Sequence, residues 1–387
     1  MISKYIKIAV LLFLIVSCKD QEGQTNLNKK TLKGNISNEF ALYFDISNNL
    51  KEYKTITVSE KWSGNNEQSS YILIERERER ERERERKFNS KSTVIQTPIK
   101  KVVCMSTSHL PFINLLGEGA SIVAVSGGRY ITDTLIKAKL KNKEIEDIGF
   151  EASINYEILM QIDPDVVFAY GISGENNQYI EKIKQAGITV VVVNDYMENH
   201  PLGKLEYLKF FGAFYNKEKM ADSLFNLAKI RYLKAKSRVE NIAVKPNVLL
   251  NAPWKDAWYI PGENNYMSHL IRDAGGVVLL SKSGESHSYT YSIENIIQEA
   301  YKAQFWLNPN YYSTLKELRT SNPLFNGIPI LKEGTVYNNI KRNTPGGGSD
   351  FWEKGVIEPD VILNDLINIL HPQLGNKKEL VYYKPLQ

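Results

Sequence analysis

Short apolar runs alternate with segments of helical period along most of this chain. Each run holds too few residues for a buried helix and is bounded by Gly, Asn or Pro, which favours buried strands. The runs that predict strands lie at 101–105, 122–125, 166–170, 190–194, 248–250, 277–280, 305–307 and 335–337. The segments with helical spacing lie at 110–117, 177–187, 265–274, 293–301, 310–319 and 359–370. This alternation is typical of an α/β protein with parallel sheets.

Two stretches that lie far apart in the sequence share one pattern. Residues 154–169 and residues 291–309 each contain a short helix that begins beside a glutamate, Glu157 or Glu294, and leads into an apolar strand. Such a repeat indicates two similar structural units. We therefore predict two α/β lobes, and the cleft between such lobes is a usual place for a small ligand.

A long helical stretch separates the two patterns. Apolar residues recur at helical spacing between residues 217 and 239, after an interruption near Tyr215 and Asn216. A helix of this length spans ~30 Å, which is enough to reach from one lobe to the other. The predicted parts are an N-terminal lobe at 99–203, connecting helices at 204–240 and a C-terminal lobe at 241–387.

A small β extension is predicted before the first lobe, at residues 37–98. Strand-like runs lie at 40–46, 54–58 and 71–74. From Glu75 to Arg86 the chain alternates strictly between Glu and Arg. Because this run has no apolar face, we interpret it as a solvated linker or an extended edge strand.

The N-terminus carries a targeting signal. Lysines precede an apolar run, Ile8 to Val16, that is too short to span a bilayer, which is typical of a signal peptide at 1–17. The residues that end at Cys18 resemble a bacterial lipobox, which implies cleavage before this cysteine and lipidation of its thiol. The alternative is an ordinary signal peptide. We expect residues 18–36 to tether the protein to the cell envelope, facing the periplasm, and the sequence leaves open which membrane holds the anchor.

Composition and motifs exclude several other classes of function. The formal net charge of +5 is spread over 387 residues without a basic stripe, so nucleic-acid binding has no support. The five histidines are scattered, and they form no cluster with carboxylates that has metal-ligand spacing. Ser108, His109 and Asp350 lack the sequence of a nucleophile elbow, so we expect no enzyme; a hydrolase is the distant alternative. Cys104 follows an apolar strand and is predicted to be a buried residue.

A set of motifs carries a resemblance to a known family. The chain resembles the ABC-transporter substrate-binding lipoproteins that capture iron chelates and cobalamin, and within them the branch found in Bacteroidetes. The motifs are residues 102–109, 126–130, 251–254, 271–276, 306–309 and 347–352. The resemblance implies two Rossmann-like lobes joined by one rigid helix, and an ABC permease with its ATPase as partners. It also implies that Glu157 and Glu294 dock onto arginines of the permease. The alternative is that each glutamate only complements a helix dipole.

Aromatic and basic residues gather in the loops that are expected to border the cleft. Flat rings suit macrocycles and catechols by stacking, and arginines suit anionic chelates. The candidate ligand-binding residues are His109, Arg129, Tyr130, Tyr170, Tyr196, Trp254, Trp258, Tyr259, Arg342 and Trp352. Some of these aromatic residues are alternatively core residues, and His109 is either a metal ligand or a helix cap. We expect a monomer without a resident cofactor. Its expected cargo is a ferric siderophore, with cobalamin and haem as alternatives.

Overall fold

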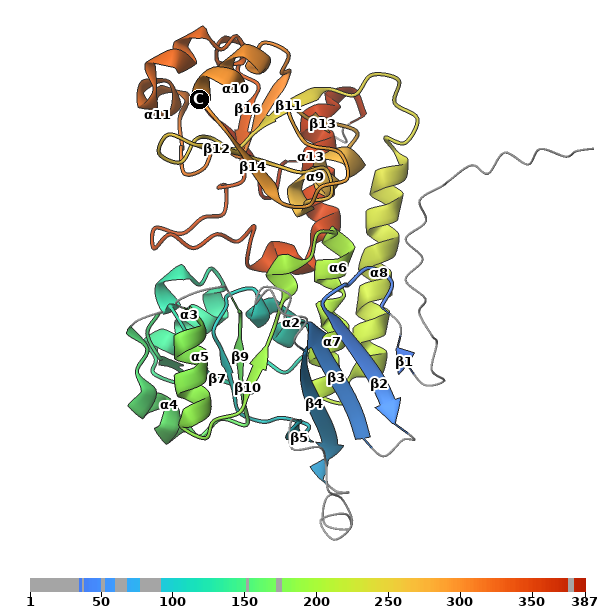
Figure 1. Cartoon of the computed structure of the whole chain (residues 1–387), viewed down its shortest axis with the longest axis vertical. Coiled ribbons are helices and arrows are strands. Elements are labelled where there is room, and N and C mark those ends of the chain that lie inside the picture. Colours follow the sequence, from blue (N-terminus) through green and yellow to red (C-terminus); the bar gives the residue numbers. More distant parts are fainter. Residues whose placement is uncertain are drawn as a thin grey trace, which may run out of the picture. The chain divides into compact units, whose positions relative to one another are not determined.

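The computed structural model describes residues 35–36, 38–49, 53–59, 68–76, 92–150, 153–171, 176–374 and 379–387. The predicted signal peptide, Cys18, most of the tether and residues 77–86 of the Glu-Arg run lie outside these residues. Residues 34–387 form one unit. This unit contains one parallel sheet, one mainly parallel sheet and an N-terminal sheet of mostly antiparallel strands (Figure 1).

The N-terminal lobe is built on a five-stranded parallel sheet in the order β10-β9-β6-β7-β8. Its strands are β6 (Val102–Cys104), β7 (Ile122–Val125), β8 (Glu146–Asp147), β9 (Val166–Ala169) and β10 (Val190–Val192). Its helices are α2 (His109–Leu115), η2 (Gly128–Tyr130), α3 (Thr134–Lys141), α4 (Tyr156–Ile162), α5 (Asn176–Gln185) and η4 (Asp195–Met197). The strands β6, β9 and β10 are buried along their whole length, as expected for a parallel sheet that is covered on both faces.

The C-terminal lobe repeats this design with the sheet order β13-β11-β15-β16-β17. Its strands are β11 (Asn247–Leu250), β13 (Val277–Val278), β15 (Phe305–Leu307), β16 (Val336–Asn338) and the antiparallel β17 (Lys384–Pro385). A separate antiparallel pair is formed by β12 (Trp258–Pro261) and β14 (Ser288–Tyr291). The helices are α9 (Tyr266–Asp273), α10 (Ile293–Ala300), α11 (Leu315–Ser321), η5 (Pro323–Gly327), α12 (Ile330–Glu333), η6 (Lys354–Ile357), α13 (Pro359–Leu370) and η7 (Pro372–Leu374).

The two lobes share one topology. Apart from the edge strands β8 and β17, the order is the same in both lobes: β6 or β11 lies between β7 or β13 and β9 or β15, and β10 or β16 lies outside β9 or β15. These pairs are parallel in both lobes. The repeated pattern in the sequence is a helix followed by a strand: α4 and β9 in the N-terminal lobe, and α10 and β15 in the C-terminal lobe. The predicted α/β fold with two similar lobes is therefore confirmed.

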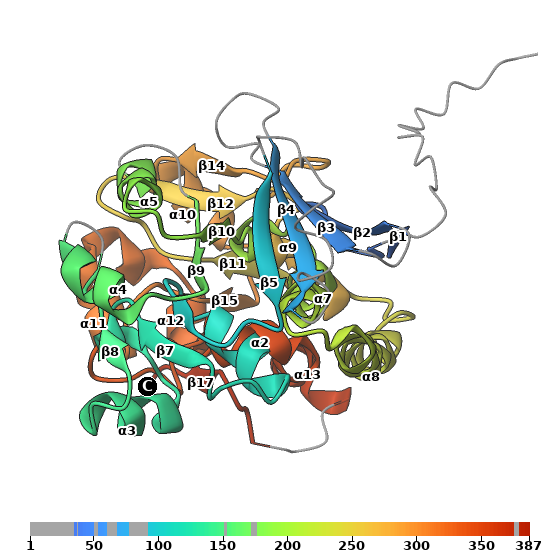
Figure 2. The same cartoon turned by 90° about the horizontal axis from the view of Figure 1, so that it is seen from below.

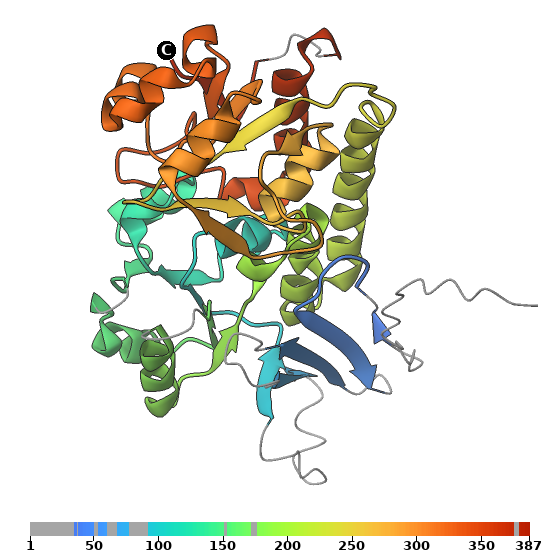
Figure 3. The same ribbon diagram turned by 45° about the horizontal axis from the view of Figure 1, so that its top comes forward.

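Three helices connect the lobes: α6 (Pro201–Leu205), α7 (Tyr207–Phe214) and α8 (Glu218–Ser237). Figures 1 and 3 show α8 alongside both lobes. Near its start α8 packs on α7 so closely that a Cβ at Gly212 would lie 2.7 Å from the Cβ of Ala221. Near its end the Tyr232 hydroxyl donates to Asp273 of the C-terminal lobe at 2.8 Å. The predicted long connecting helix is thus present and has side-chain contacts at both ends.

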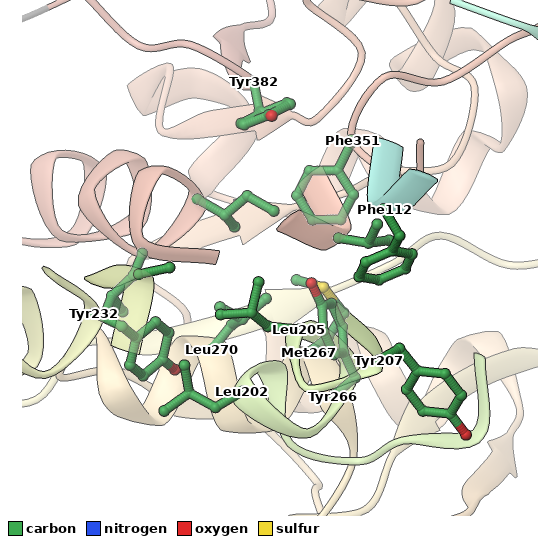
Figure 4. Close-up of a cluster of buried hydrophobic side chains, with 14 of the residues drawn as sticks. Phe112, Leu202, Leu205, Tyr207, Tyr232, Tyr266, Met267, Leu270, Phe351 and Tyr382 are labelled. Atoms are coloured by element: carbon green, nitrogen blue, oxygen red, sulfur yellow. The ribbon is translucent and has the colours of Figure 1, made fainter. Parts of the chain in front are cut away.

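Buried side chains from both lobes and the connecting helices meet in one core. Figure 4 shows Leu202 and Leu205 of α6 beside Met267 and Leu270 of α9. All four side chains are buried, with exposed fractions of 7% or less. Burial of a Leu or Met side chain contributes roughly 1.5–3 kcal/mol, so this contact resists separation of the lobes.

The N-terminal extension is a five-stranded sheet beside α7 and the N-terminal lobe (Figure 2). Its strands are β1 (Asn35–Ile36), β2 (Phe44–Asn49), β3 (Tyr53–Ser59), β4 (Gln68–Glu75) and β5 (Thr93–Thr97). Phe44 packs edge-on against Tyr207 and Phe210 of α7, with ring centres 4.7 and 5.4 Å apart. The Val192 amide of β10 donates to the Tyr71 hydroxyl, so the extension also contacts the lobe's sheet.

Two buried glutamates hold the chain just before β2. The Glu206 carboxylate accepts three consecutive backbone N–H groups, those of residues 39–41, at 2.8–2.9 Å. The Glu198 carboxylate accepts the next two, from residues 42 and 43, at 2.9–3.1 Å. The prediction of a strand from residue 40 is therefore wrong, because these N–H groups are bound by carboxylates and the ladder begins at Phe44.

A third buried carboxylate joins the two lobes directly. Glu353, which precedes η6 of the C-terminal lobe, accepts the backbone N–H groups of Thr132 and Asp133, both at 2.7 Å. Beside it, the Thr132 hydroxyl donates to the Asp350 carboxylate at 2.8 Å. Burial raises the pKa of Glu353, and the hydrogen bonds from Thr132 and Asp133 oppose that rise. This contact fixes the position of one lobe against the other.

One predicted helix begins later in the structure than expected, and one pair of strands was not predicted. The helix predicted at 310–319 begins only at Leu315, because Thr314 forms a capping box with Glu317 there. The pair β12 and β14 was not predicted, and its first residue, Trp258, is fully buried.

We expect the Glu206→Gln substitution to destabilise the protein by about 2–4 kcal/mol. A glutamine keeps the shape but loses the charge and one acceptor, and a hydrogen bond to a charged group contributes roughly 1.5–3 kcal/mol. Urea denaturation measures the effect. The matched control is Glu240→Gln, since Glu240 is exposed; its effect should stay within about 0.5 kcal/mol. Equal losses in both variants would contradict the role of Glu206.

Candidate ligand-binding site

The candidate site lies at the carboxyl ends of the C-terminal sheet. In open α/β sheets, ligands bind beyond the carboxyl ends of the strands, where the strand order reverses direction. In this lobe that point lies between β11 and β15, because β13 and β16 flank them on opposite sides. The residues that directly follow β11 and β15 are Asn251 and Asn308.

Asparagines shape the turns at this edge. Asn251, Asn308 and Asn310 all have left-handed backbones, with φ values of 65°, 54° and 49°. Asparagine tolerates this conformation better than most residues other than glycine. The Asn251 side-chain amide donates to the Tyr259 carbonyl at 2.9 Å, and that of Asn310 donates to the Ala252 carbonyl at 2.9 Å. These bonds tie the neighbouring loops together.

Two stacked tryptophans support these turns from below. The rings of Trp258 and Trp306 are fully buried, with centres 5.5 Å apart. The Trp306 indole N–H donates to the Asn251 carbonyl at 2.6 Å, and that of Trp258 donates to the Leu250 carbonyl at 2.9 Å. The end of β11 is therefore held by core side chains as well as by its own loop.

A cavity of about 750 Å³ opens above these turns. Its lining combines amide side chains with aromatic rings and consists of Asn251, Ala252, Trp254, Tyr259, Met267, Asn308, Asn310, Tyr311, Asn339, Ile340, Asn343, Ser349 and Trp352. This volume is in the range of small-molecule sites. No charged side chain is among the described residues that line it.

Four aromatic side chains of the lining are unusually exposed. The exposed fractions are 57% for Trp254, 44% for Tyr259, 68% for Tyr311 and 43% for Trp352. Large exposed rings on one concave surface are typical of a binding site, because burial of such rings by a ligand is favourable.

The cavity borders the contact between the lobes. Its edge residues Ser349 and Trp352 follow a glycine turn, residues 346–348, that lies against η2 of the N-terminal lobe. A Cβ at Gly346 would lie 2.3 Å from the Arg129 carbonyl, and a Cβ at Gly348 would lie 2.1 Å from that of Tyr130. Only glycine allows this close approach of the two backbones.

Three of the predicted ligand-binding residues line this cavity, namely Trp254, Tyr259 and Trp352. Four others belong to the N-terminal lobe and are not in the lining: Arg129, Tyr130, Tyr170 and Tyr196. The Arg129 guanidinium lies over the Tyr130 ring, 4.4 Å from its centre. Tyr196 of η4 is 40% exposed, and the partial burial of its side chain raises its pKa.

Arg342 lies in a different place from the one predicted. Its Nε atom pairs with the Asp350 carboxylate at 2.9 Å. Its side chain lines a second cavity of about 410 Å³ together with Thr132, Asp133 and Glu353, at the contact between the lobes. The prediction that Arg342 faces the ligand is not supported by this position, because its charge is already paired.

His109 and Trp258 are core residues, contrary to the prediction that they contact the ligand. Both have exposed fractions of 0%. The His109 ring packs against Phe168 and Phe211, with ring centres 6.4 and 5.8 Å away. Its Nε2 atom lies 3.9 Å from the Asp195 carboxylate. Burial lowers the pKa of His109 to about 4, an effect that nearby Asp195 partly opposes.

The two predicted docking glutamates occupy equivalent positions. Glu157 is the second residue of α4 and Glu294 the second residue of α10, and both are exposed. Asn155 caps α4 by accepting from the Ile158 amide, and Ser292 caps α10 by accepting from the Asn295 amide. Within the described part of the chain, neither glutamate forms an ion pair.

Sequence reasoning missed the asparagines of the cavity. Each of the strands β11 and β15 is followed directly by an asparagine, and β16 ends in Asn338 with Asn339 next to it. Strand-to-asparagine transitions at three parallel strands were therefore a readable signal. The side chain of Asn338 is fully buried and donates to the carbonyls of Asn310 and Tyr312, which positions the loop after β15.

The described residues contain neither a cluster of metal ligands nor a membrane-spanning helix. Among them, no group of three or more His, Cys, Asp or Glu side chains is arranged to hold a metal ion. In the same part of the chain, no helix combines the length and the apolar character that crossing a bilayer requires.

Comparison with known proteins agrees with a two-lobed binding protein. An uncharacterized lipoprotein of Methanocaldococcus jannaschii is 28% identical over 315 residues, which cover 78% of this chain and 72% of that protein. An uncharacterized ABC transporter substrate-binding lipoprotein of Bacillus subtilis is 26% identical over 186 residues, 47% of this chain and 56% of that protein. The crystal structure of the triscatecholate siderophore-binding protein of Bacillus subtilis, complexed with ferri-bacillibactin, matches with a TM-score of 0.54 and 17% identity. That match covers 72% of this chain and 94% of the solved one.

The fold and its cavity define a binding protein with two α/β lobes. Residues 102–339 match the family described as periplasmic binding protein, and the chain belongs to that family.

Because His109 is buried in the core, we predict that the protein loses stability at acidic pH. With a folded pKa of about 4 and an ordinary pKa of 6.5, the imidazole is neutral in the folded chain but takes up a proton in the unfolded chain. Stability should therefore fall as the pH drops from 6.5 towards 4, by up to about 3 kcal/mol.

The variant His109→Phe lacks this group, so its stability should vary less over the same pH range. Urea denaturation of both proteins at pH 7.5, 5.5 and 4.5 measures the difference. Parallel pH profiles for the two proteins would show that His109 does not titrate as a buried group.

Proposed function

We propose that this protein is the substrate-binding component of an ABC importer and that it captures a metal chelate in the cavity at the ends of β11, β15 and β16. The observation that carries the proposal is the cavity of about 750 Å³, with exposed aromatic rings, in a member of the periplasmic binding protein family. The relative from Bacillus subtilis that is named as an ABC transporter substrate-binding lipoprotein supports the assignment to this class of importer.

The flat rings of the cavity favour a bulky cargo over a bare ion. Trp254 and Trp352 are both exposed in the lining and offer faces for stacking. Ferric siderophores, cobalamin and haem are the chelates we propose as cargo. A solved neighbour of this fold binds ferri-bacillibactin, but likeness at 17% identity concerns the fold alone.

We propose that the permease recognises the exposed glutamates Glu157 and Glu294. Their helices precede β9 and β15, which occupy equivalent positions in the two sheets, so each lobe presents one carboxylate in the same local setting. Carboxylates pair with arginine through two parallel hydrogen bonds, and complementary charges across an interface steer docking. An anchor at Cys18, in the envelope and facing the periplasm, would keep the protein near such a permease.

Binding of a chelate should quench the tryptophan fluorescence of the purified full chain, and the Trp254→Ala substitution should weaken that binding about tenfold. Loss of one aromatic stacking partner costs about 0.5–1.5 kcal/mol beyond the lost buried area. The titration uses a ferric siderophore, cyanocobalamin and haemin as separate probes.

The matched control is Tyr301→Ala, because Tyr301 is 60% exposed but lies outside the cavity lining. Its affinity should equal that of the wild type. The absence of binding by every probe would refute the proposed cargo class, and equal loss in both variants would refute the cavity as the binding site.

Charge reversal at both docking positions should abolish transport and leave ligand affinity unchanged. The double variant Glu157→Lys/Glu294→Lys would repel arginines on the permease. Uptake of the cargo by cells or proteoliposomes measures the effect. The control is Glu144→Lys/Glu240→Lys, which reverses two exposed glutamates outside α4 and α10. Normal uptake by the first variant would disprove the docking assignment.

A further inference from the structure

The lining of the cavity at β11 and β15 has a definite electrical character. Its polar groups are the side chains of five asparagines, one serine and two tyrosines and the indole N–H groups of two tryptophans, and no charged side chain is among the described residues of the lining. A site that binds a highly charged chelate in a partly enclosed cavity needs opposite charges, because removal of unpaired charge from water is costly.

Two of the three positive side chains that adjoin the lining in the sequence are already paired. Lys341 follows the lining residue Ile340, and its ammonium pairs with Glu379 at 2.7 Å. Arg342 comes next and pairs with Asp350. Lys255 follows Trp254 and is itself followed by Asp256, so that this exposed turn carries both signs of charge.

One buried lysine lies close to the cavity wall. The Lys204 ammonium is 5.8 Å from the ring centre of Trp352 and 4.9 Å from that of Tyr266. Lys204 has an exposed fraction of only 6% and is not in the lining. The carboxylates of Asp195 and Glu198 interact with it electrostatically, and both are buried with it. Its charge is therefore balanced within the protein.

Two asparagines of the lining, Asn251 and Asn310, use side-chain N–H groups within the protein. The side-chain N–H groups of Asn251 and Asn310 donate to the carbonyls of Tyr259 and Ala252. Within the described part of the chain no group donates to the side-chain oxygen of either residue, so these two oxygens are free to accept from a ligand. A ligand that suits these oxygens carries N–H or O–H donors at its edge, beside a flat body that stacks on the aromatic rings.

We infer that the cavity selects chelates without net negative charge that carry hydrogen-bond donors, and that its asparagines determine this selectivity. The inference rests on the proposed function and narrows its cargo. Uncharged ferric trihydroxamates and corrinoids with peripheral amides belong to the selected class. Ferric tris-catecholates, which are triply anionic, and haem, with its two carboxylates, do not.

The test is a set of fluorescence titrations of the full chain with an uncharged ferric trihydroxamate, cyanocobalamin, a ferric tris-catecholate and haemin. We expect at least one of the two uncharged probes to bind at least tenfold more tightly than either anionic probe. The affinity of that probe should change little between 50 and 500 mM salt, because no ion pair forms.

Three variants test whether the missing positive charge in the lining causes the selectivity. Asn343 is an exposed lining residue, so Asn343→Arg adds a cation to the cavity and should increase the affinity for the anionic probes about tenfold. The variant Asn343→Gln adds length without charge and should not. Asn241→Arg makes the same change of net charge at an exposed position outside the lining and should leave all affinities unchanged.

The outcomes separate the inference from the proposed function. Tighter binding of an anionic probe by the wild type would overturn the inference, but it would still agree with the proposed function as the binding component of an importer. Loss of that binding in Arg129→Gln would then identify Arg129 as the cation. If no probe binds to the wild type or to any variant, the proposed function fails, and the inference fails with it.

Discussion

Buried carboxylates that accept runs of backbone N–H groups hold the separate parts of this molecule together. Glu206 and Glu198 bind five consecutive N–H groups of the chain that leads into the extension. Glu353 binds two N–H groups across the contact between the lobes. Asp365 of α13 binds those of residues 381–383, which lead into β17. A buried carboxylate without such partners would be very costly, so each segment is confined to one place.

This constraint bears directly on the cavity. The turn of residues 346–348 lies between the cavity edge and η2, and Asp350 and Glu353 follow it within a few residues. The cavity edge is therefore attached to the N-terminal lobe through the same contact that joins the lobes. Together with α8, which has partners in both halves, this arrangement favours a site that exists before the ligand arrives. A preformed site avoids the entropy cost of ordering loops upon binding.

The two lobes share a backbone plan but differ in the side chains at the ends of their strands. In both lobes the carboxyl ends of the parallel strands form one edge, and the capped helices α4 and α10 precede the equivalent strands β9 and β15. In the C-terminal lobe the strand ends are bordered by exposed aromatic rings and asparagines. In the N-terminal lobe the corresponding loop after β6 leads into His109, which is buried among phenylalanines. The two lobes thus share a backbone plan but differ in what their strand ends offer a ligand.

The sequence by itself determined the α/β class, the two similar lobes and the long connecting helix, because these follow from the local period of apolar residues. It also named Trp254, Tyr259 and Trp352 as candidate residues, and these three line the cavity. Only the tertiary structure decided that Trp258 and His109 are core residues and that Arg342 is paired with Asp350. These outcomes depend on residues that are distant in the chain. A pattern of neighbouring residues shows which side chains suit a ligand, whereas packing between distant segments decides which of them remain exposed and which charges remain unpaired.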